Sequence, residues 1–212
     1  MYKIYYNDQL ICLCHQSYQS LIDLREGDLN LRYSGKTKFI LSVLDKLEKN
    51  IDVKRAIIYF SDLKKLKEDF FSLFKIVKAS GGLVLNKRSE MLLIFRRGNW
   101  DLPKGKMELR ETKKEAALRE VIEETGLKDV SLINKLITTY HIYLDKSGRR
   151  VLKPSYWYTM FTAQEKLIPQ LEEDIEKAIW AKSEDITAGN YEPMYSSIRL
   201  ALQEFSNSLP HS

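Results

Sequence analysis

One helix constrains the fold of this chain more than any other feature of its sequence. Thr112 and Glu115 have the spacing of a capping box, in which a hydroxyl and a carboxylate bind the first free amides of a helix. The sequence therefore predicts a helix that begins at Lys113, and Gly126 is well placed to end it after Thr125. At about 100° per residue, one face is apolar and should pack on a core. That face holds Ala117, Leu118, Val121 and Ile122.

The other face of this helix gathers carboxylates. Glu120, Glu123 and Glu124 stand at i, i+3 and i+4, so their side chains converge on one patch, and Ala116 keeps that patch open. Arg119 is the helix residue positioned to offset the charge of Glu123. A solvated charged face is one interpretation. The other is a site for a hard divalent cation, best Mg²⁺, and the repulsion between like charges at this spacing favours it.

The segment from Gly105 to Leu127 resembles the Nudix box without a departure. Gly105, Glu111 and the run REVIEETGL from Arg119 carry the pattern, which fixes nine positions over 23 residues. The flanking SGGLVL, LLIFRRGNWDLPKGK and a late strand that ends at Trp180 are similar to other parts of a Nudix domain, over residues 76–205. Just before Glu111, relatives often have Pro-Gly where this chain has Leu-Arg, so the loop there is expected to differ in shape.

The resemblance implies an α/β/α sandwich on a mixed sheet and the hydrolysis of a nucleoside diphosphate linked to another group. It implies that Mg²⁺, with Mn²⁺ as a substitute, is held by glutamates and a backbone carbonyl and activates a water molecule. The implied metal ligands are Gly105, Glu120, Glu123 and Glu124, and the implied catalytic residues are Glu111, Arg119, Glu120 and Glu123. The general base is a box glutamate or a later acid among Glu172, Glu173, Asp174 and Glu176.

Substrate contacts are predicted outside the box. The loop from Trp100 to Lys106 is similar to that of relatives that cleave dinucleoside polyphosphates, inositol pyrophosphates or nucleoside triphosphates, and a (di)nucleoside polyphosphate is favoured over ADP-ribose. For the lysines, solvated loop side chains are the alternative, and for the aromatic residues the alternative is core packing. Strand alternation allows one of Arg96 and Arg97 to face the site. The candidates are Arg96, Trp100, Lys104, Lys106, Lys153 and Tyr156.

Composition and charge narrow the class of protein. The chain has 212 residues, of which 44% are hydrophobic, and no apolar run reaches the roughly 18 residues of a membrane span. Its N-terminus lacks the features of a secretory signal, so a cytoplasmic protein without a membrane partner is predicted. Cys12 and Cys14 alternate within a strand and are expected to be structural rather than metal ligands. A net charge of +5 falls short of a nucleic-acid footprint. The resemblance implies a small nucleotide as the partner.

Two domains are predicted, a small α/β domain over residues 1–75 and a Nudix domain over residues 76–212. The expected elements of the first are strands 1–6, 10–13 and 56–60, a helix over 38–49 and a helix capped by Ser61. Those of the second are strands 76–85, 91–95, 132–142 and 156–162, a breaker-rich loop over 98–105, and a helix over about 194–205.

The role of residues 1–75 has several alternatives. Simple extension of the fold is favoured over covering the cleft, forming a homodimer or binding a regulator. For the whole chain, a nucleotide sensor and a hydrolase addressed by an N-terminal RNA- or protein-binding adaptor compete with the plain enzyme. The intact glutamates argue against the sensor, and salt-sensitive RNA binding would support the adaptor.

Overall fold

The computed structural model describes residues 1–19, 21–50 and 52–209, which divide into two compact units. The first unit consists of Met1–Val77 and Tyr140–Lys153. The second consists of Lys78–Thr139 and the residues from Pro154 onward. The structure therefore joins a later hairpin segment to the N-terminal residues, which the sequence did not suggest. A boundary at residues 75 and 76, and independent folding of either part, stay predictions.

The first unit is a mixed sheet with helices, and it agrees closely with the expected elements. Strand β1 pairs in parallel with the end of β10 and antiparallel with β2, and β4 pairs in parallel with both β2 and β3. Its elements are β1 (Tyr2–Tyr6), β2 (Gln9–His15), α1 (Gln16–Gln19), β3 (Leu29–Arg32), α2 (Thr37–Lys49), β4 (Arg55–Phe60), α3 (Leu63–Phe71) and β5 (Lys75–Ile76).

Strand alternation separates the two faces of this sheet. One face forms a core with α2 and α3, to which β2 contributes Ile11 and Leu13. Cys12 and Cys14 lie on the opposite face against Ile57, and both are buried free thiols. Burial raises the pKa of the Cys12 thiol to about 11, which keeps it protonated and unreactive. Both cysteines therefore pack as core residues, which fits a structural role.

The predicted cap of α3 was wrong by one residue. Asp62, not Ser61, is the N-cap, and its carboxylate accepts a hydrogen bond of 2.9 Å from the amide of Lys65. An aspartate and a serine cap a helix about equally well, so their order in the sequence could not decide between them. Leu66 and Phe70 of this helix are buried.

The second unit is built on a mixed sheet in the order β12–β7–β6–β11–β10. Strand β6 is parallel to β11 and antiparallel to β7, which is antiparallel to β12. Its elements are β6 (Ala79–Leu85), β7 (Met91–Arg96), β8 (Asn99–Asp101), β9 (Lys104–Lys106), α4 (Lys113–Thr125), β10 (Ser131–Leu144), β11 (Arg150–Phe161), the 3₁₀ turn η1 (Leu171–Glu173), β12 (Ile175–Ala181), α5 (Ser183–Thr187) and α6 (Ser196–Ser208).

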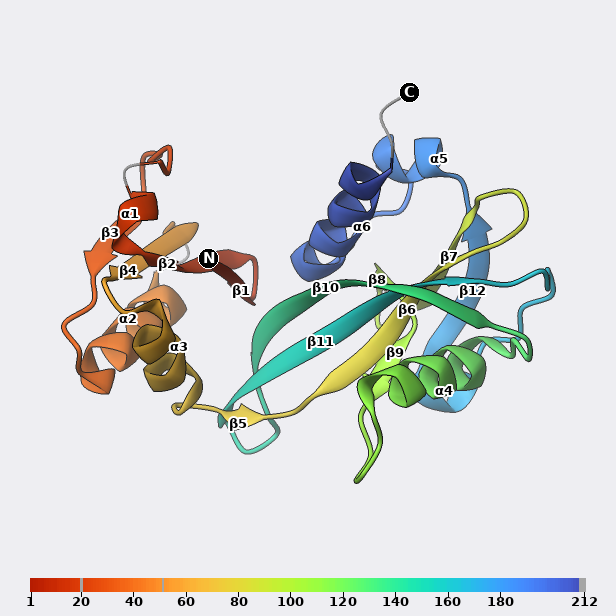
Figure 1. Cartoon of the computed structure of the whole chain (residues 1–212), viewed down its shortest axis with the longest axis horizontal. Coiled ribbons are helices and arrows are strands. Elements are labelled where there is room, and N and C mark those ends of the chain that lie inside the picture. Colours follow the sequence, from red (N-terminus) through yellow and green to blue (C-terminus); the bar gives the residue numbers. More distant parts are fainter. Residues whose placement is uncertain (20, 51, 210–212) are drawn as a thin grey trace. The chain divides into compact units, whose positions relative to one another are not determined.

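Helices cover both faces of this second sheet (Figure 1). Neighbouring strand residues point to opposite faces, so Val84 packs in the core beneath α4 whereas Leu83 packs in the core beneath α6. Tyr158 and Trp157 divide between the two cores in the same way. The result is the α/β/α sandwich on a mixed sheet that the sequence predicts. None of the helices that the structure describes is long and apolar enough to cross a membrane.

The breaker-rich segment 98–105 was expected to be a loop, and this expectation was wrong. It forms two short strands separated by Pro103: β8 pairs with β7, and β9 pairs with β6, where Gly105 lies opposite Ser80. The unpaired edges of β6 and β7 supply these partners, and their availability depends on the assembled sheet rather than on local sequence. Gly105 is thereby fixed to the sheet.

Candidate active site

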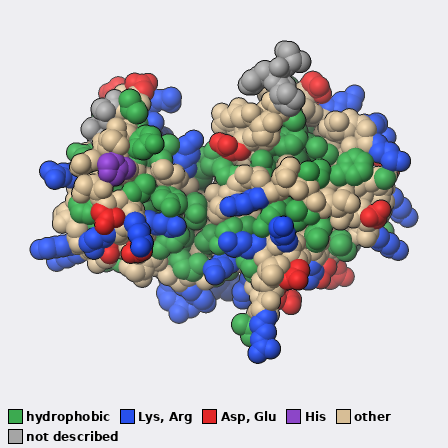
Figure 2. Space-filling model, viewed as in Figure 1, with side chains coloured by type: hydrophobic (Ala, Val, Ile, Leu, Met, Phe, Trp, Pro, Cys, Tyr) green, Lys and Arg blue, Asp and Glu red, His purple; other side chains and the backbone are tan. Residues whose placement is uncertain are grey.

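The helix α4 carries the clustered glutamates and has the predicted ends. The amide of Glu115 donates to the Thr112 hydroxyl at 3.3 Å, and the amide of Thr112 donates to the Glu115 carboxylate at 2.8 Å, which completes the capping box. At the other end Gly126 adopts a left-handed φ of 69°. Figure 2 shows acidic side chains grouped over this helix. Local sequence signals therefore set both ends of the helix that carries the clustered glutamates.

The helix α4 packs unusually close to strand β6. A Cβ atom on Gly82 would lie 2.7 Å from the sulfur of Met160 and 2.9 Å from Cγ2 of Val121, so glycine is required for this approach. The predicted apolar stripe was only partly right, because Ile122 is 37% exposed. Ala116 on the carboxylate face is instead fully buried. The helix has turned its glutamates partly into the protein, toward β6 and β9.

Arg119 joins three carboxylates around one guanidinium group. Its Nε and Nη2 atoms donate to the two oxygens of Glu111 at 2.8 and 2.9 Å, and Nη1 donates to Glu120 and Glu123 at 2.9 Å each. Its Nη2 also donates to the carbonyl of Lys106 at 3.2 Å. The two parallel bonds to Glu111 fix the guanidinium plane. Arg119 can therefore hold the other two carboxylates in defined positions.

Glu111 is held as tightly as the arginine that it binds. Besides both bonds from Arg119, its carboxylate accepts the amide of Glu108 at 2.9 Å. These interactions, with the Arg119 bonds first, lower the pKa of Glu111. An ionised Glu111 in the loop before α4 keeps Arg119 in place, and its catalytic role stays a prediction.

Burial raises the pKa of two of the three clustered glutamates. Glu124 is fully buried, and desolvation raises its pKa to about 7 although Lys104 and Arg96 act in the opposite direction. Desolvation also raises the pKa of Glu120, against the lowering effect of Arg119. Glu123 has a side chain that is 49% exposed. The cluster therefore combines two desolvated carboxylates with one that reaches solvent.

A second group of charges lies behind Glu124. Its Oε1 accepts Nη1 of Arg96 at 2.9 Å, and its Oε2 accepts the amide of Lys104 at 2.7 Å. Asp101 accepts a charge-assisted hydrogen bond from the Lys104 ammonium group and lies 3.7 Å from Nε of Arg96. Asp101 is 1% exposed and Lys104 is 8% exposed, so this is a network of buried charges. This network holds the Glu124 carboxylate in place.

The residues present fit a divalent cation by chemical type. Oxygen ligands with several negative charges are what Mg²⁺ prefers. Gly105 leaves the space, because a Cβ atom there would lie 1.9 Å from Oε2 of Glu120. As they stand in the described residues, no three His, Cys, Asp or Glu side chains are grouped closely enough to hold an ion. Arg119 and Arg96 hold the carboxylates instead, so cation binding would require the glutamates to turn from these partners.

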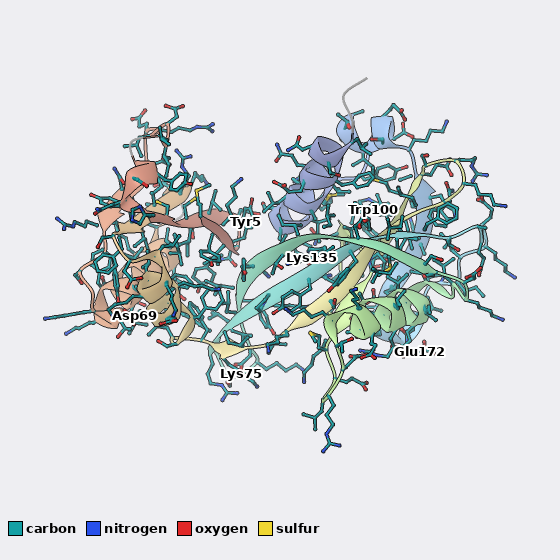
Figure 3. All side chains as sticks on the ribbon, in the orientation of Figure 1. Tyr5, Asp69, Lys75, Trp100, Lys135 and Glu172 are labelled. Atoms are coloured by element: carbon teal, nitrogen blue, oxygen red, sulfur yellow. The ribbon has the colours of Figure 1, made fainter. Side chains whose placement is uncertain are left out.

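The predicted substrate contacts have diverse surroundings. Lys106 is exposed in β9, and the Lys113 ammonium group lies 4.0 Å from the ring centroid of Tyr156. Trp100 packs edge-on against Tyr191, with ring centroids 5.1 Å apart, and against Phe95; Figure 3 marks its position. Arg96 and Lys104 bind carboxylates as described above, and Lys153 belongs to the first unit. All six stay predicted contacts.

The later acids predicted as general bases also differ from one another. Asp174 binds Arg97 through a bidentate ion pair at 2.9 and 3.0 Å. The negative charge of Glu173 contributes to the raised pKa of Glu120, which indicates that Glu173 lies near the cluster. Glu172 and Glu176 are exposed.

Asp101 is a site residue that the sequence did not reveal. Its one signal is an acid three residues before Lys104, and that spacing is uninformative in a segment expected to be a loop. Formation of β8 and β9 turns the aspartate inward beneath Glu124. Its contacts with Lys104 and Arg96 therefore depend on the tertiary structure.

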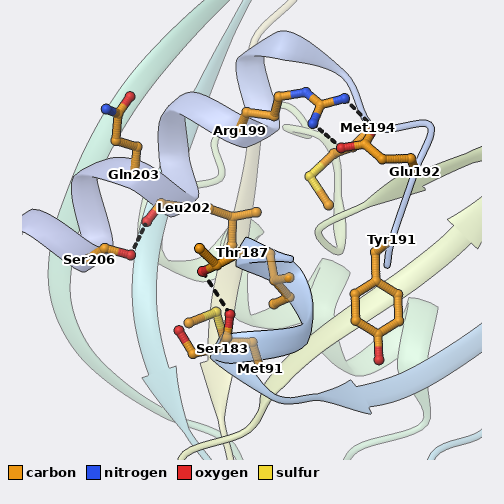
Figure 4. Close-up of a pocket in the computed structure, with 11 residues that line it drawn as sticks. Met91, Ser183, Thr187, Tyr191, Glu192, Met194, Arg199, Leu202, Gln203 and Ser206 are labelled. Atoms are coloured by element: carbon orange, nitrogen blue, oxygen red, sulfur yellow. Dashed lines mark hydrogen bonds and ion pairs between the residues drawn. The ribbon is translucent and has the colours of Figure 1, made fainter. Parts of the chain in front are cut away.

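A separate cavity of about 190 Å³ lies on the α6 side of the sheet (Figure 4). Met91, Met194 and Leu202 contribute apolar wall, and Tyr191 closes one side. The polar lining groups bind one another: Arg199 forms an ion pair with Glu192. None of the box glutamates lines this cavity.

Comparisons with known proteins agree with the sandwich and the carboxylate helix. The family model described as NUDIX domain matches residues 75–204, more than half of the chain. Over 69 residues the chain is 44% identical to the provisionally named mutator protein MutT4 of Mycobacterium tuberculosis, which covers 32% of this chain and 27% of that protein. Over 46 residues it is 46% identical to the provisionally named 8-oxo-dGTP diphosphatase of Bacillus subtilis, covering 21% and 31%.

A solved structure shows the same fold over a longer stretch. The MutT protein from Methanosarcina mazei Go1 superposes with a TM-score of 0.51 at 21% identity, over 63% of this chain and 95% of that one. The matches to the two curated relatives span about a third of their lengths or less. Together with the family model, the complete box on α4 establishes that the chain belongs to the NUDIX family.

Proposed function

We propose that the chain is a Mg²⁺-dependent hydrolase of a nucleoside diphosphate linked to another group, with a (di)nucleoside polyphosphate as the favoured substrate. The observation that carries this proposal is the cluster in which Arg119 binds Glu111, Glu120 and Glu123. A structural salt-bridge network would not require three acids for one arginine. An excess of carboxylate beside Gly105 suits a cation that bridges to phosphate.

Four groups would hold the cation: the carboxylates of Glu120, Glu123 and Glu124 and the carbonyl of Gly105. When bound, Mg²⁺ would offset the charge of the diphosphate and lower the pKa of a water molecule. Mn²⁺ is the expected substitute, because it also prefers oxygen ligands.

The protein residues would orient the reactants and accept the proton. Arg119, fixed by Glu111, positions the glutamates. Attack of water forms one P–O bond as the bridging P–O bond breaks, the leaving phosphate departs with the electron pair, and a carboxylate takes the water proton. We favour Glu173 for this step over Asp174, because Arg97 holds Asp174 whereas the charge of Glu173 acts on Glu120.

Nucleoside triphosphates that carry a damaged base are the second candidate substrates. The relative from Bacillus subtilis bears the name of an 8-oxo-dGTP diphosphatase, and the shared 46 residues support a related substrate class. A cytoplasmic location is part of the proposal, since the two buried cysteines are free thiols. Dimer formation stays a prediction.

The test is hydrolysis of a substrate panel by the purified full chain with Mg²⁺. The panel contains dinucleoside polyphosphates, nucleoside triphosphates, 8-oxo-dGTP, ADP-ribose, NADH and an inositol pyrophosphate, with products identified by mass and chromatography. We expect turnover of a (di)nucleoside polyphosphate, lost with EDTA and restored by Mg²⁺. A Glu173→Gln variant should be slower than a matched Glu176→Gln variant. Tight binding of one compound without turnover would favour the sensor instead.

Replacing Gly105 by alanine is expected to lower activity by roughly 10- to 100-fold, as changes beside metal ligands typically do. The new Cβ atom would displace the Glu120 carboxylate, which lies within 2.4 Å of the Cβ position. The stability cost should be small, because the atoms that must move are the end of a flexible side chain. Activity over a Mg²⁺ titration, with thermal unfolding measured alongside, checks both effects. Unchanged activity would argue against a cation beside Gly105.

A further inference from the structure

The positive charge of the chain is concentrated in the first unit. Residues 1–77 and 140–153 contain 17 basic and 11 acidic residues, a net charge of +6. The remaining residues contain 17 basic and 18 acidic ones, a net charge of −1. The whole-chain net charge of +5 conceals this separation, because the sequence does not show that residues 140–153 belong to the first unit. A small unit with this charge attracts polyanions.

The first unit leaves one face of its sheet without α2 and α3. The core beneath these helices takes Ile4 and Tyr6 from β1, so the alternate residue Tyr5 faces the other way. Tyr5 pairs with His141 on β10 and marks this face in Figure 3. The rings of His141 and Tyr143 stack with centroids 6.1 Å apart and an interplanar angle of 28°. Over β2 and β4 this face is buried beneath α1 and Ile22, so we call only the part that β1 and β10 form the open face.

The aromatic side chains of the open face keep ring surface available. Tyr5, His141 and Tyr143 are each half-buried, and they come from two adjacent strands. By alternation Lys3 lies on the same face, beside Tyr5 on β1. Three aromatic rings and a lysine of two adjacent strands therefore share one patch.

We propose that the open face of the first unit binds single-stranded nucleic acid. Bases stack on half-exposed aromatic rings of a sheet, and the phosphates between them bind nearby lysines and arginines. An acidic polypeptide would use the cations but not the rings. This binding would bring the hydrolase of the second unit to nucleic acid, and it is independent of the substrate of that unit.

The test is fluorescence anisotropy of the full chain with labelled 12-nucleotide single strands of RNA and DNA, and with the matching duplex. We expect the single strands to bind at low salt, more tightly than the duplex, with affinity that falls as salt rises. Comparing the affinities of the RNA strand and the DNA strand shows which of the two nucleic acids the surface prefers. Heparin and poly-glutamate serve as competitors, and neither should displace the strand at equal charge.

Matched variants locate the binding surface. Tyr5→Ala and Tyr143→Ala should weaken binding about tenfold each, the size of one lost base stack. Tyr2→Ala is the control, because Tyr2 is a half-buried residue of the same strand on the helix side. Tyr143→Phe keeps the ring and should bind as the wild type does. Lys3→Gln should weaken binding and reduce the salt slope by about 0.7, whereas Lys64→Gln on α3 should not.

Three results would overturn the proposal. The first is no binding of either single strand at low salt. The second is equal loss in the Tyr5 and Tyr2 variants, which would indicate a fold defect, with circular dichroism of each variant as the check. The third is equal displacement by heparin or poly-glutamate, which would reduce the surface to a general polyanion attraction. Turnover of the substrate panel is unaffected by any of these outcomes, so the two proposals fail separately.

Discussion

Replacing Glu123 by glutamine is expected to lower kcat by at least about 100-fold while the protein remains folded. Loss of a metal ligand should cost at least as much as loss of a residue that supports one. The Glu123 side chain is 49% exposed and contacts Arg119 through one oxygen. Exposed substitutions of this kind change the free energy of unfolding by about 0.5 kcal/mol or less. Activity and stability should therefore separate.

The measurement is kcat and KM for a substrate turned over in the panel, at saturating Mg²⁺, with thermal unfolding on the same sample. Glu184→Gln is the matched control, since Glu184 is an exposed glutamate of the same unit in α5. It should retain wild-type activity. If Glu123→Gln retains it too, the carboxylates on α4 are a solvated helix face and the proposed function is wrong.

Replacing Asp101 by asparagine is expected to destabilise the protein by about 3–5 kcal/mol, the usual result of breaking a buried ion pair. The variant keeps the shape of the side chain but leaves the Lys104 ammonium group buried without its counter-charge. For a chain of this size that loss corresponds to a fall in Tm on the order of 10 °C. Equilibrium unfolding in urea at neutral pH, with thermal unfolding beside it, measures the effect.

A double-mutant cycle separates the ion pair from other contributions. Lys104→Met alone should also destabilise, because the carboxylate of Asp101 is then left with a more distant cation, Arg96 at 3.7 Å. The double variant should cost clearly less than the sum of the two single variants, because the mutual charge is removed from both sides. Additive costs would show that Asp101 and Lys104 stabilise the protein independently.

The same cycle bears on the predicted phosphate contact of Lys104. In the structure its ammonium group binds Asp101 and its amide binds Glu124. If Lys104 acts by holding Glu124 in place, the amide bond survives in Lys104→Met and kcat should fall little in the folded fraction. If it binds substrate phosphate, KM should rise in that variant.

The helix that bears the glutamates was predictable from the sequence because each signal for it is local. Thr112 and Glu115 start it and Gly126 ends it, within a single stretch of chain. The i, i+3, i+4 spacing of Glu120, Glu123 and Glu124 follows from helical geometry alone. The same holds for β1, β2, α2 and β4, whose hydrophobic periods lie within a few residues.

The tertiary structure decided what lies around that helix. Ile122 is partly exposed and Ala116 is buried because α4 packs against β9 as well as against the rest of the sheet. The spacing of apolar residues along a helix does not reveal such an additional packing partner. Strands β8 and β9 exist because β7 and β6 offer free edges, and only then does Asp101 reach Lys104 and Arg96.

The separation of charge has the same origin. Residues 140–153 are distant in sequence from residues 1–77, and parallel pairing of β1 with β10 brings their cations into one unit. By itself the sequence determined which reactive groups the chain brings together on α4, because the glutamates and their helical spacing belong to one continuous segment. Burial, counter-charges and the grouping of cations depend on contacts between distant segments, and these only the folded chain defines.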